Sequence, residues 1–247
     1  SNRNTNIRLC SEAISGAIVQ PGEEFSINNL TGERTAAKGY KDAAVIKNGV
    51  YIDEPGGGVC QVSSTLFNAV VRAGLEITER HNHTIASSYV PLGEDAAIDY
   101  PAKDFKFRNN SEGPVAVVMS FDESEKKLTA SVYGIPILED GVTLDLESEV
   151  TFEAIEAEIK KIVKADLPVE KRFITVEEGR EGSKVTTYLL TLKDGEEIDR
   201  EVLHTSSYPA KAPVMAINSN ALPSTAPDIP EEGGSTDGGL EDGSSED

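Results

Sequence analysis

The stretch GGGVCQVSSTLFNAVVRAG, residues 56–74, decides how the first half of this chain folds. Three consecutive glycines interrupt any element before it, and apolar residues then recur at helical spacing. Gly74 stands where a residue in the left-handed region commonly ends a helix. The pattern predicts a helix from about Cys60 to Ala73, with a cysteine in its first turn.

The start of this predicted helix is a favourable place for a reactive thiol. A free cysteine has a pKa of about 8.5, and the positive end of a helix dipole lowers that value. The amide N–H groups of Gln61 and Val62 could hold the oxyanion of a tetrahedral intermediate. Gly57 and Gly58 would let a substrate backbone approach closely. The other interpretation is a glycine-rich turn before a helix that happens to begin with Cys60.

A cysteine nucleophile needs a base, and two histidines follow the helix. His81 and His83 fall on a segment that we predict to be extended, residues 77–90, so both would face the same side. Either could accept the proton of Cys60. A rival interpretation makes Cys60, His81 and His83 ligands of a zinc ion. The group that orients the histidine stays open among these candidates: Asp95, Asp99, Asp104 or a backbone carbonyl.

Two further features near the helix each have two interpretations. Ser63, with Ser64 and Thr65, forms a polar face on the first turn that either binds substrate or caps the helix. Cys10 lies in an apolar helical pattern and is expected to be a buried small hydrophobe. The alternative is a disulfide between Cys10 and Cys60, which is common in exported proteins.

The rest of the chain indicates an α+β fold with a mainly antiparallel sheet in the first domain and a small, mostly β second domain. In the first domain we predict a helix over 4–18, a hairpin over 43–52 that turns at Asn48–Gly49, and strands over 105–109, 115–121 and 128–133. In the second we predict strands over 142–152, 172–176, 185–192 and 198–205, and a short helix over 154–163. The expected domains are residues 1–136 and 137–218, followed by a disordered acidic Gly/Ser/Pro tail over 219–247.

Charge and hydropathy exclude several functions. The net charge of −20 argues against nucleic acid, because binding to phosphates needs clustered Lys and Arg. No run of about 20 apolar residues is present, so we expect no membrane-spanning segment in this sequence. No cofactor-binding fingerprint appears, and we expect no cofactor.

Four stretches together resemble the VanW domain, a family named for an accessory gene of vancomycin-resistance clusters: PGEEFSINNLTGERT, GGGVCQVSSTLFNAVVRAGLEITERHNHT, SSYVPLGEDAAIDYPAKDFKFRNN and VYG. The resemblance covers about residues 4–135. It places the family cysteine on Cys60 and the histidine of the signature E-R-x-x-H-[ST] on His83, which makes His83 the preferred base. The signature arginine falls on Arg80, which would either steer a substrate carboxylate or form a structural ion pair.

The resemblance also implies a function and a place. VanW-like proteins belong to the walls of Gram-positive bacteria, often behind an upstream membrane anchor, so we expect an extracellular location. The domain is viewed as an L,D-transpeptidase that cross-links peptidoglycan stem peptides through its cysteine. Two alternatives stay open: a cysteine carboxypeptidase or endopeptidase on the same substrate, and a wall-binding protein with no turnover.

Residues 142–217 resemble the small wall-binding domain named for five glycines. Gly179, Gly182 and Gly195 match its turns, whereas the glycines expected near Glu170 and Asn218 are absent. The resemblance implies binding to polymers that contain N-acetylglucosamine, and the two missing glycines weaken that implication. The expected partners are therefore peptidoglycan stem peptides and glycan.

Overall fold

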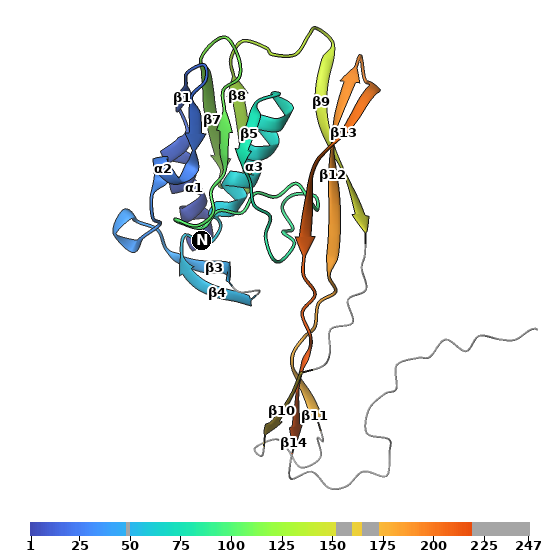
Figure 1. Ribbon diagram of the computed structural model, residues 1–247. Coiled ribbons are helices and arrows are strands. Elements are labelled where there is room, and N and C mark those ends of the chain that lie inside the picture. The colour runs from blue at the N-terminus through green and yellow to red at the C-terminus, as the bar shows by residue number, and fades with distance from the viewer. Residues whose placement is uncertain (48–49, 152–159, 165–172, 219–247) are drawn as a thin grey trace, which may run out of the picture. The chain divides into compact units, whose positions relative to one another are not determined.

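The computed structural model describes residues 1–47, 50–151, 160–164 and 173–218 (Figure 1). The contacts within the chain divide it into two compact units. Unit 1 comprises residues 1–158 and 179–212, and unit 2 comprises residues 159–178 and 213–247. The two units are described separately below.

Unit 1 is built around two helices that lie in its core. Helix α1 spans Asn2–Ile14 and helix α3 spans Val59–Arg72, while α2 is a short helix over Ile27–Thr31 and a 3₁₀ turn covers Ala36–Lys38. Cys10 and Ile14 of α1 are fully buried, as are Val62 and Leu66 of α3. The apolar stripe predicted for residues 60–73 is therefore the face that packs into the core.

Short antiparallel sheets surround these helices in unit 1. One sheet has the order β1-β7-β8, with bounds Ile18–Val19, Val115–Asp122 and Lys127–Tyr133. A second has the order β2-β6-β5, with bounds Glu24–Ser26, Lys106–Arg108 and Glu76–Glu79. Strands β3 (Asp42–Lys47) and β4 (Val50–Pro55) form a hairpin. The hairpin leads directly into the three glycines that precede α3.

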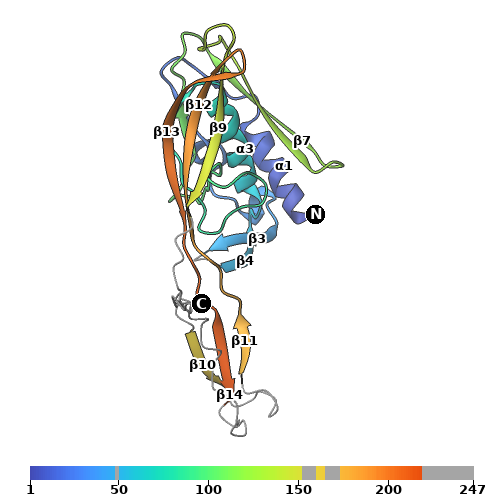
Figure 2. The ribbon, with the colours of Figure 1, turned by 90° about the vertical axis from the view of Figure 1, so that its right-hand side faces the viewer.

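A third antiparallel sheet in unit 1 consists of long strands in the order β13-β12-β9 (Figure 2). Their bounds are Glu196–Tyr208, Ser183–Lys193 and Val142–Thr151. Leu146 of β9 belongs to the same buried core as α3, and Leu189 and Leu203 pack against that core. This sheet, which comes late in the sequence, is therefore packed onto the helix that carries Cys60.

Unit 2, as far as it is described, is a small sheet in the order β10-β14-β11. Strand β10 (Lys160–Lys164) pairs in parallel with β14 (Val214–Asn218), and β11 (Phe173–Glu177) pairs with β14 in the antiparallel direction. Over all the described residues the strand pairs are mainly antiparallel, which together with the helices confirms the α+β class and the β-rich C-terminal region.

Three sequence predictions of secondary structure need correction. The helix predicted over 4–18 ends at Ile14, and Ile18 instead pairs with Ala116 in β1. The extended segment predicted over 77–90 is a strand only up to Glu79. Of the helix predicted over 154–163, the described residues 160–163 form strand β10. The turn Asn48–Gly49, residues 154–159 and the tail over 219–247 lie outside the described residues.

No helix within the described ranges combines the length and the apolar character that crossing a bilayer requires.

Candidate active site

Cys60 is the second residue of α3 and lines an open cleft of about 1030 Å³. Gly58 caps the helix with a left-handed φ of 107°, a conformation that side chains other than glycine rarely adopt. The Cys60 thiol is partly buried, and its Sγ lies 3.5 Å from the carbonyl oxygen of Ile98. Both cysteines are free thiols, and buried Cys10 has a pKa raised to about 12 because burial disfavours its thiolate. The disulfide interpretation is therefore wrong.

His83 lines the same cleft as Cys60, and its ring lies close enough to lower the pKa of the thiol. Its Nδ1 lies 2.5 Å from Oδ2 of Asp95, and its backbone N–H donates to the same oxygen at 2.7 Å. The other ring nitrogen, Nε2, lies 3.4 Å from the hydroxyl of Tyr89. Asp95 thus orients His83, and His83 acts on the Cys60 thiol, which is the order of groups in a nucleophile–histidine–carboxylate triad.

The electrostatics of Cys60, His83 and Asp95 favour a thiolate beside an imidazolium. Burial alone would raise the pKa of Cys60, but the hydrogen bond and the charge of His83 outweigh it and lower the pKa. Burial alone would lower the pKa of His83, but its bonds to Asp95 and Cys60 raise it to about 9. The pKa of Asp95 falls to about 2, because its bonds to His83 and Tyr208 outweigh burial. Asp95 is therefore ionised at neutral pH.

Asp95 is held on its other oxygen by two further side chains. Oδ1 accepts hydrogen bonds from the Tyr208 hydroxyl at 2.6 Å and from Nη2 of Arg80 at 3.0 Å. Arg80 also donates from Nε to the Asp95 backbone carbonyl and from Nη1 to the Ser206 hydroxyl. With only 7% of its side chain exposed, Arg80 forms the structural ion pair, and the carboxylate-steering role predicted for it is wrong.

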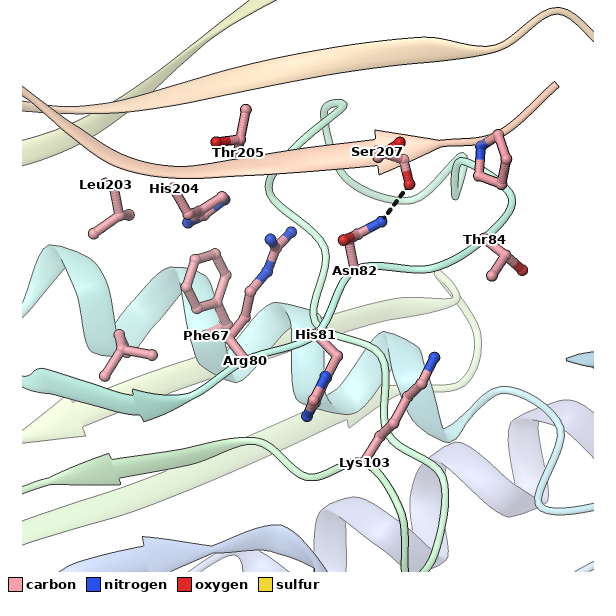
Figure 3. A pocket seen from close by; sticks show the side chains of 12 residues that line it. Phe67, Arg80, His81, Asn82, Thr84, Lys103, Leu203, His204, Thr205 and Ser207 are labelled. Carbon is pink, nitrogen blue, oxygen red and sulfur yellow. Dashed lines mark hydrogen bonds between the residues drawn. The ribbon is translucent and has the colours of Figure 1, made fainter.

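His81 lines a pocket of about 620 Å³ (Figure 3) and is not among the residues that line the cleft of Cys60. Its side chain is 38% exposed and its Nε2 bonds Oε1 of Glu79 at 3.0 Å. His81 and His83 do not share one face, because the strand ends at Glu79 and the chain continues irregularly. The Cys60–His81–His83 ligand set does not converge, and the described residues contain no cluster of three or more metal-ligating side chains.

Several other residues that we predicted for the site are engaged elsewhere. Gly57 is buried, and a Cβ there would clash with the Ala43 backbone, so the lack of a side chain allows close packing against β3. Ser63 is fully buried and donates to the Ala96 carbonyl at 2.6 Å, so it ties the loop before Ile98 to α3. Gly58 does line the cleft.

The predicted oxyanion donors are also engaged or in a helical position. The amide of Gln61 donates to the Gly58 carbonyl at 3.0 Å, although its side chain lines the cleft. Val62 is the fourth residue of α3, where an amide ordinarily bonds the carbonyl of the cap residue. By contrast, the amide of Cys60 donates no hydrogen bond to any described loop, cap or side-chain group.

Sequence reasoning left Asp95 among several candidates and missed Tyr208 altogether. Asp95 lies 12 residues from His83, whereas Tyr208 lies 113 residues from Asp95, on strand β13. A bond between such distant positions leaves no trace in local sequence patterns. The β13 segment could only be connected to the site once the fold was known.

Comparison with known proteins gives two family matches. Residues 2–133 match the family described as VanW like protein, and residues 147–218 match the G5 domain. "Uncharacterized protein YoaR" of Bacillus subtilis (strain 168) is 47% identical over 116 residues, covering 47% of this chain and 38% of that protein. "Vancomycin B-type resistance protein VanW" of Enterococcus faecalis is 29% identical over 129 residues, covering 50% of this chain and 47% of that protein. The chain thus spans less than half the length of each curated relative.

Two solved G5 structures also match part of the chain. The crystal structure of HP0197-G5 is 20% identical and covers 30% of this chain and 97% of its own, with a TM-score of 0.18. The IgA1 protease G5 domain structure is 23% identical and covers 32% of this chain and 89% of its own, with a TM-score of 0.23.

Proposed function

The chain belongs to the VanW-like protein family and carries a G5 domain, and from this premise we propose that it is a cysteine acyltransferase acting on peptidoglycan stem peptides, an L,D-transpeptidase. The observation that carries the proposal is that Cys60 and His83 line one open cleft, with His83 held by Asp95. The two domains point to a cell-wall-associated, extracellular protein, which puts peptidoglycan within reach of that cleft.

In the first half of the reaction, the Cys60 thiolate attacks the stem-peptide carbonyl that precedes the terminal D-alanine. A sulfur–carbon bond forms, and the carbonyl oxygen becomes an oxyanion. The carbon–nitrogen bond then breaks as the His83 imidazolium gives its proton to the departing amine of D-alanine. The products are a thioester on Cys60, free D-alanine and a neutral His83 that is still oriented by Asp95.

In the second half, the side-chain amine of a neighbouring stem peptide attacks the thioester. Neutral His83 accepts a proton from this amine, the carbon–sulfur bond breaks, and Cys60 leaves as a thiolate. The imidazolium is then restored beside the thiolate, which is the state that the pKa shifts favour. One peptide bond is broken and one is formed, so no external energy source is needed.

The amide of Cys60, which has no partner among the described residues, is the donor that best suits the oxyanion. It lies on the nucleophile itself, in the first turn of α3, where the helix dipole adds positive potential. The side chain of Gln61 is held by a 2.9 Å bond from Arg3 to Oε1, which leaves its amide NH₂ as a second donor at the cleft wall. The Cys60 amide and the Gln61 side chain thus take the oxyanion-binding role that the sequence had given to the backbone amides of Gln61 and Val62.

Cationic side chains in the cleft suit a substrate that carries carboxylates. Arg3, Arg34 and Lys103 line the cleft, together with the acidic residues Glu33, Glu54 and Asp99. Arg34 donates from Nη1 to Asn28 at 2.7 Å, while its buried Nε and Nη2 have no partner among the described residues. The positive charge of this guanidinium favours a carboxylate bound in the cleft. We assign Arg34 to a carboxylate of the donor stem peptide.

The test is to incubate the purified protein with disaccharide-tetrapeptides and to analyse the products by mass spectrometry. We expect cross-linked dimers and free D-alanine from the wild-type protein and neither product from Cys60→Ala. Cys10→Ala is the matched control, because it removes the other thiol, and it should retain activity as long as it folds. Dimers formed by Cys60→Ala would end the proposal. Shortened stems without dimers would instead show a hydrolase with the same nucleophile.

A further inference from the structure

The sheet β13-β12-β9 lies outside the residues matched by the VanW-like family, yet strand β13 reaches Asp95 of the proposed catalytic site. We propose that Tyr208 is a positioning residue: its hydroxyl fixes the Asp95 carboxylate, and through it His83, so that the G5-domain strand completes the active site. The inference rests on the proposed function of Cys60, but it can be tested on the reactivity of the thiol alone.

The Tyr208 hydroxyl has two bonds, and both fix the loop that carries Asp95. It donates to Oδ1 of Asp95 at 2.6 Å and accepts from the backbone N–H of Gly93 at 2.9 Å. Tyr208 is only 3% exposed, and its pKa is raised by burial and by the Asp95 charge, so the phenol stays protonated. It therefore donates to a carboxylate that is ionised at neutral pH.

Gly93 shows that this loop is shaped to fit the sheet. Its carbonyl accepts from Nε2 of His204 at 2.7 Å, and His204 also belongs to β13. Gly93 has a φ of +86°, and a Cβ at this position would clash with the Thr187 hydroxyl and approach that of Ser148 to 2.9 Å. These residues lie on β12 and β9. The turn before Asp95 thus packs tightly against strands that come more than 50 residues later in the sequence.

Arg80 connects the same parts from the other side. Its Nη2 bonds the Gly93 carbonyl at 2.9 Å and Oδ1 of Asp95 at 3.0 Å, and its Nη1 bonds the Ser206 hydroxyl of β13 at 2.9 Å. Both carboxylate oxygens of Asp95 are therefore hydrogen-bonded. Oδ2 bonds His83, and Oδ1 bonds Tyr208 and Arg80. Such a carboxylate cannot rotate without breaking several charge-assisted bonds, which keeps the imidazole aligned with Cys60.

The experiment measures the rate of Cys60 alkylation by iodoacetamide as a function of pH, with the labelled site read by peptide mass spectrometry. For Tyr208→Phe we expect the midpoint of the pH profile to rise by about half a unit to one unit. Below both midpoints the rate should then fall about 3- to 10-fold. Tyr188→Phe is the matched control, because that hydroxyl lies on β12 and bonds the exposed Glu149. Its profile should match that of the wild type.

Each outcome decides the proposal. An unchanged midpoint in folded Tyr208→Phe would overturn it. A lower midpoint would do the same, because it would mean that the hydroxyl only weakens the carboxylate as a base. If Tyr208→Phe does not fold, Ser206→Ala decides: it removes the β13 partner of Arg80, and a smaller rise in the midpoint is expected. A wild-type protein that gave no dimers would refute the proposed function, but the effect of Tyr208→Phe on the alkylation of Cys60 would still stand.

Discussion

Asp95 accepts two hydrogen bonds from one residue: Oδ2 lies 2.5 Å from Nδ1 of His83 and 2.7 Å from its backbone nitrogen. The side chain and the main chain of His83 are thus bound by the same oxygen, which fixes both the tautomer and the orientation of the ring. A histidine held in this way presents its other nitrogen to a nucleophile, the arrangement that an acyl-transfer site requires.

Removing the His83 imidazole should abolish the acidity of the Cys60 thiol. Without the hydrogen bond and charge of His83, burial dominates and the Cys60 pKa should rise to at least its free value of about 8.5. We expect His83→Gln to lower the alkylation rate of Cys60 at pH 6.5 by at least about tenfold. His81→Gln is the control and should alkylate like the wild type, because His81 bonds Glu79 in a separate pocket. Equal losses in both variants would contradict the assignment.

Replacing Asp95 should cost stability as well as reactivity. Asp95→Asn removes a buried charge that balances Arg80 and His83, and breaking such a pair typically costs about 3–5 kcal/mol. Urea denaturation measures the change in unfolding free energy. Asp99→Asn is the matched control on an exposed carboxylate four residues away and should change stability by less than about 0.5 kcal/mol. An Asp95→Asn variant with an almost unchanged free energy of unfolding would show that the bonds of Asp95 to Arg80 and His83 do not stabilise the fold.

The same carboxylate should make the fold acid-sensitive in a defined range. Its pKa is about 2 in the folded state against an ordinary value of 3.8, so the unfolded state binds the proton first. The contribution is fully present above about pH 4 and is lost as the pH falls towards about 2. It amounts to about 2 kcal/mol. Across this range, the free energy of unfolding should fall more steeply with decreasing pH for the wild type than for Asp95→Asn. Parallel curves would mean that other carboxylates carry the acid sensitivity.

Arg34 should affect substrate binding more than the chemical step. Arg34→Gln removes a positive charge from the cleft wall, and a lost charge-assisted bond corresponds to about 1.5–3 kcal/mol. We expect the KM for a tetrapeptide donor to rise by about tenfold or more, with a smaller change in kcat. Arg72→Gln is the control, since Arg72 lies at the end of α3 and pairs with Asp145. A loss confined to kcat would contradict the binding role.

Local signals in the sequence predicted those parts of the fold that local interactions determine. The helix α3 and the β3–β4 hairpin follow from periodicity and punctuation within about 20 residues. The helix over 4–18 was overextended because Ile18 continues the apolar spacing, although Gly16 turns the chain with a φ of 87° and Ile18 is 54% exposed in β1. Periodicity alone cannot show whether an apolar residue points into the core.

The candidate site divides in the same way. Cys60 and His83 are marked by a motif, and the structure brings them together. The prediction of an extended segment over 77–90 was wrong beyond Glu79. There the backbone bonds side chains such as Asp95 instead of a neighbouring strand. The sequence left the role of Arg80 open between a substrate carboxylate and a structural ion pair, because its partners Asp95 and Ser206 lie 15 and 126 residues away. Only the three-dimensional arrangement shows that its donors are already used.

The central claim is that Cys60 carries the acyl group, and intact-protein mass spectrometry tests it most directly. The protein is mixed with a disaccharide-tetrapeptide donor and quenched in acid before an acceptor is added. The account predicts an adduct equal to the donor minus D-alanine, located on Cys60, sensitive to hydroxylamine and absent from Cys60→Ala. A wild-type protein that forms cross-links with no such adduct on Cys60, or an adduct that persists in Cys60→Ala, would contradict it.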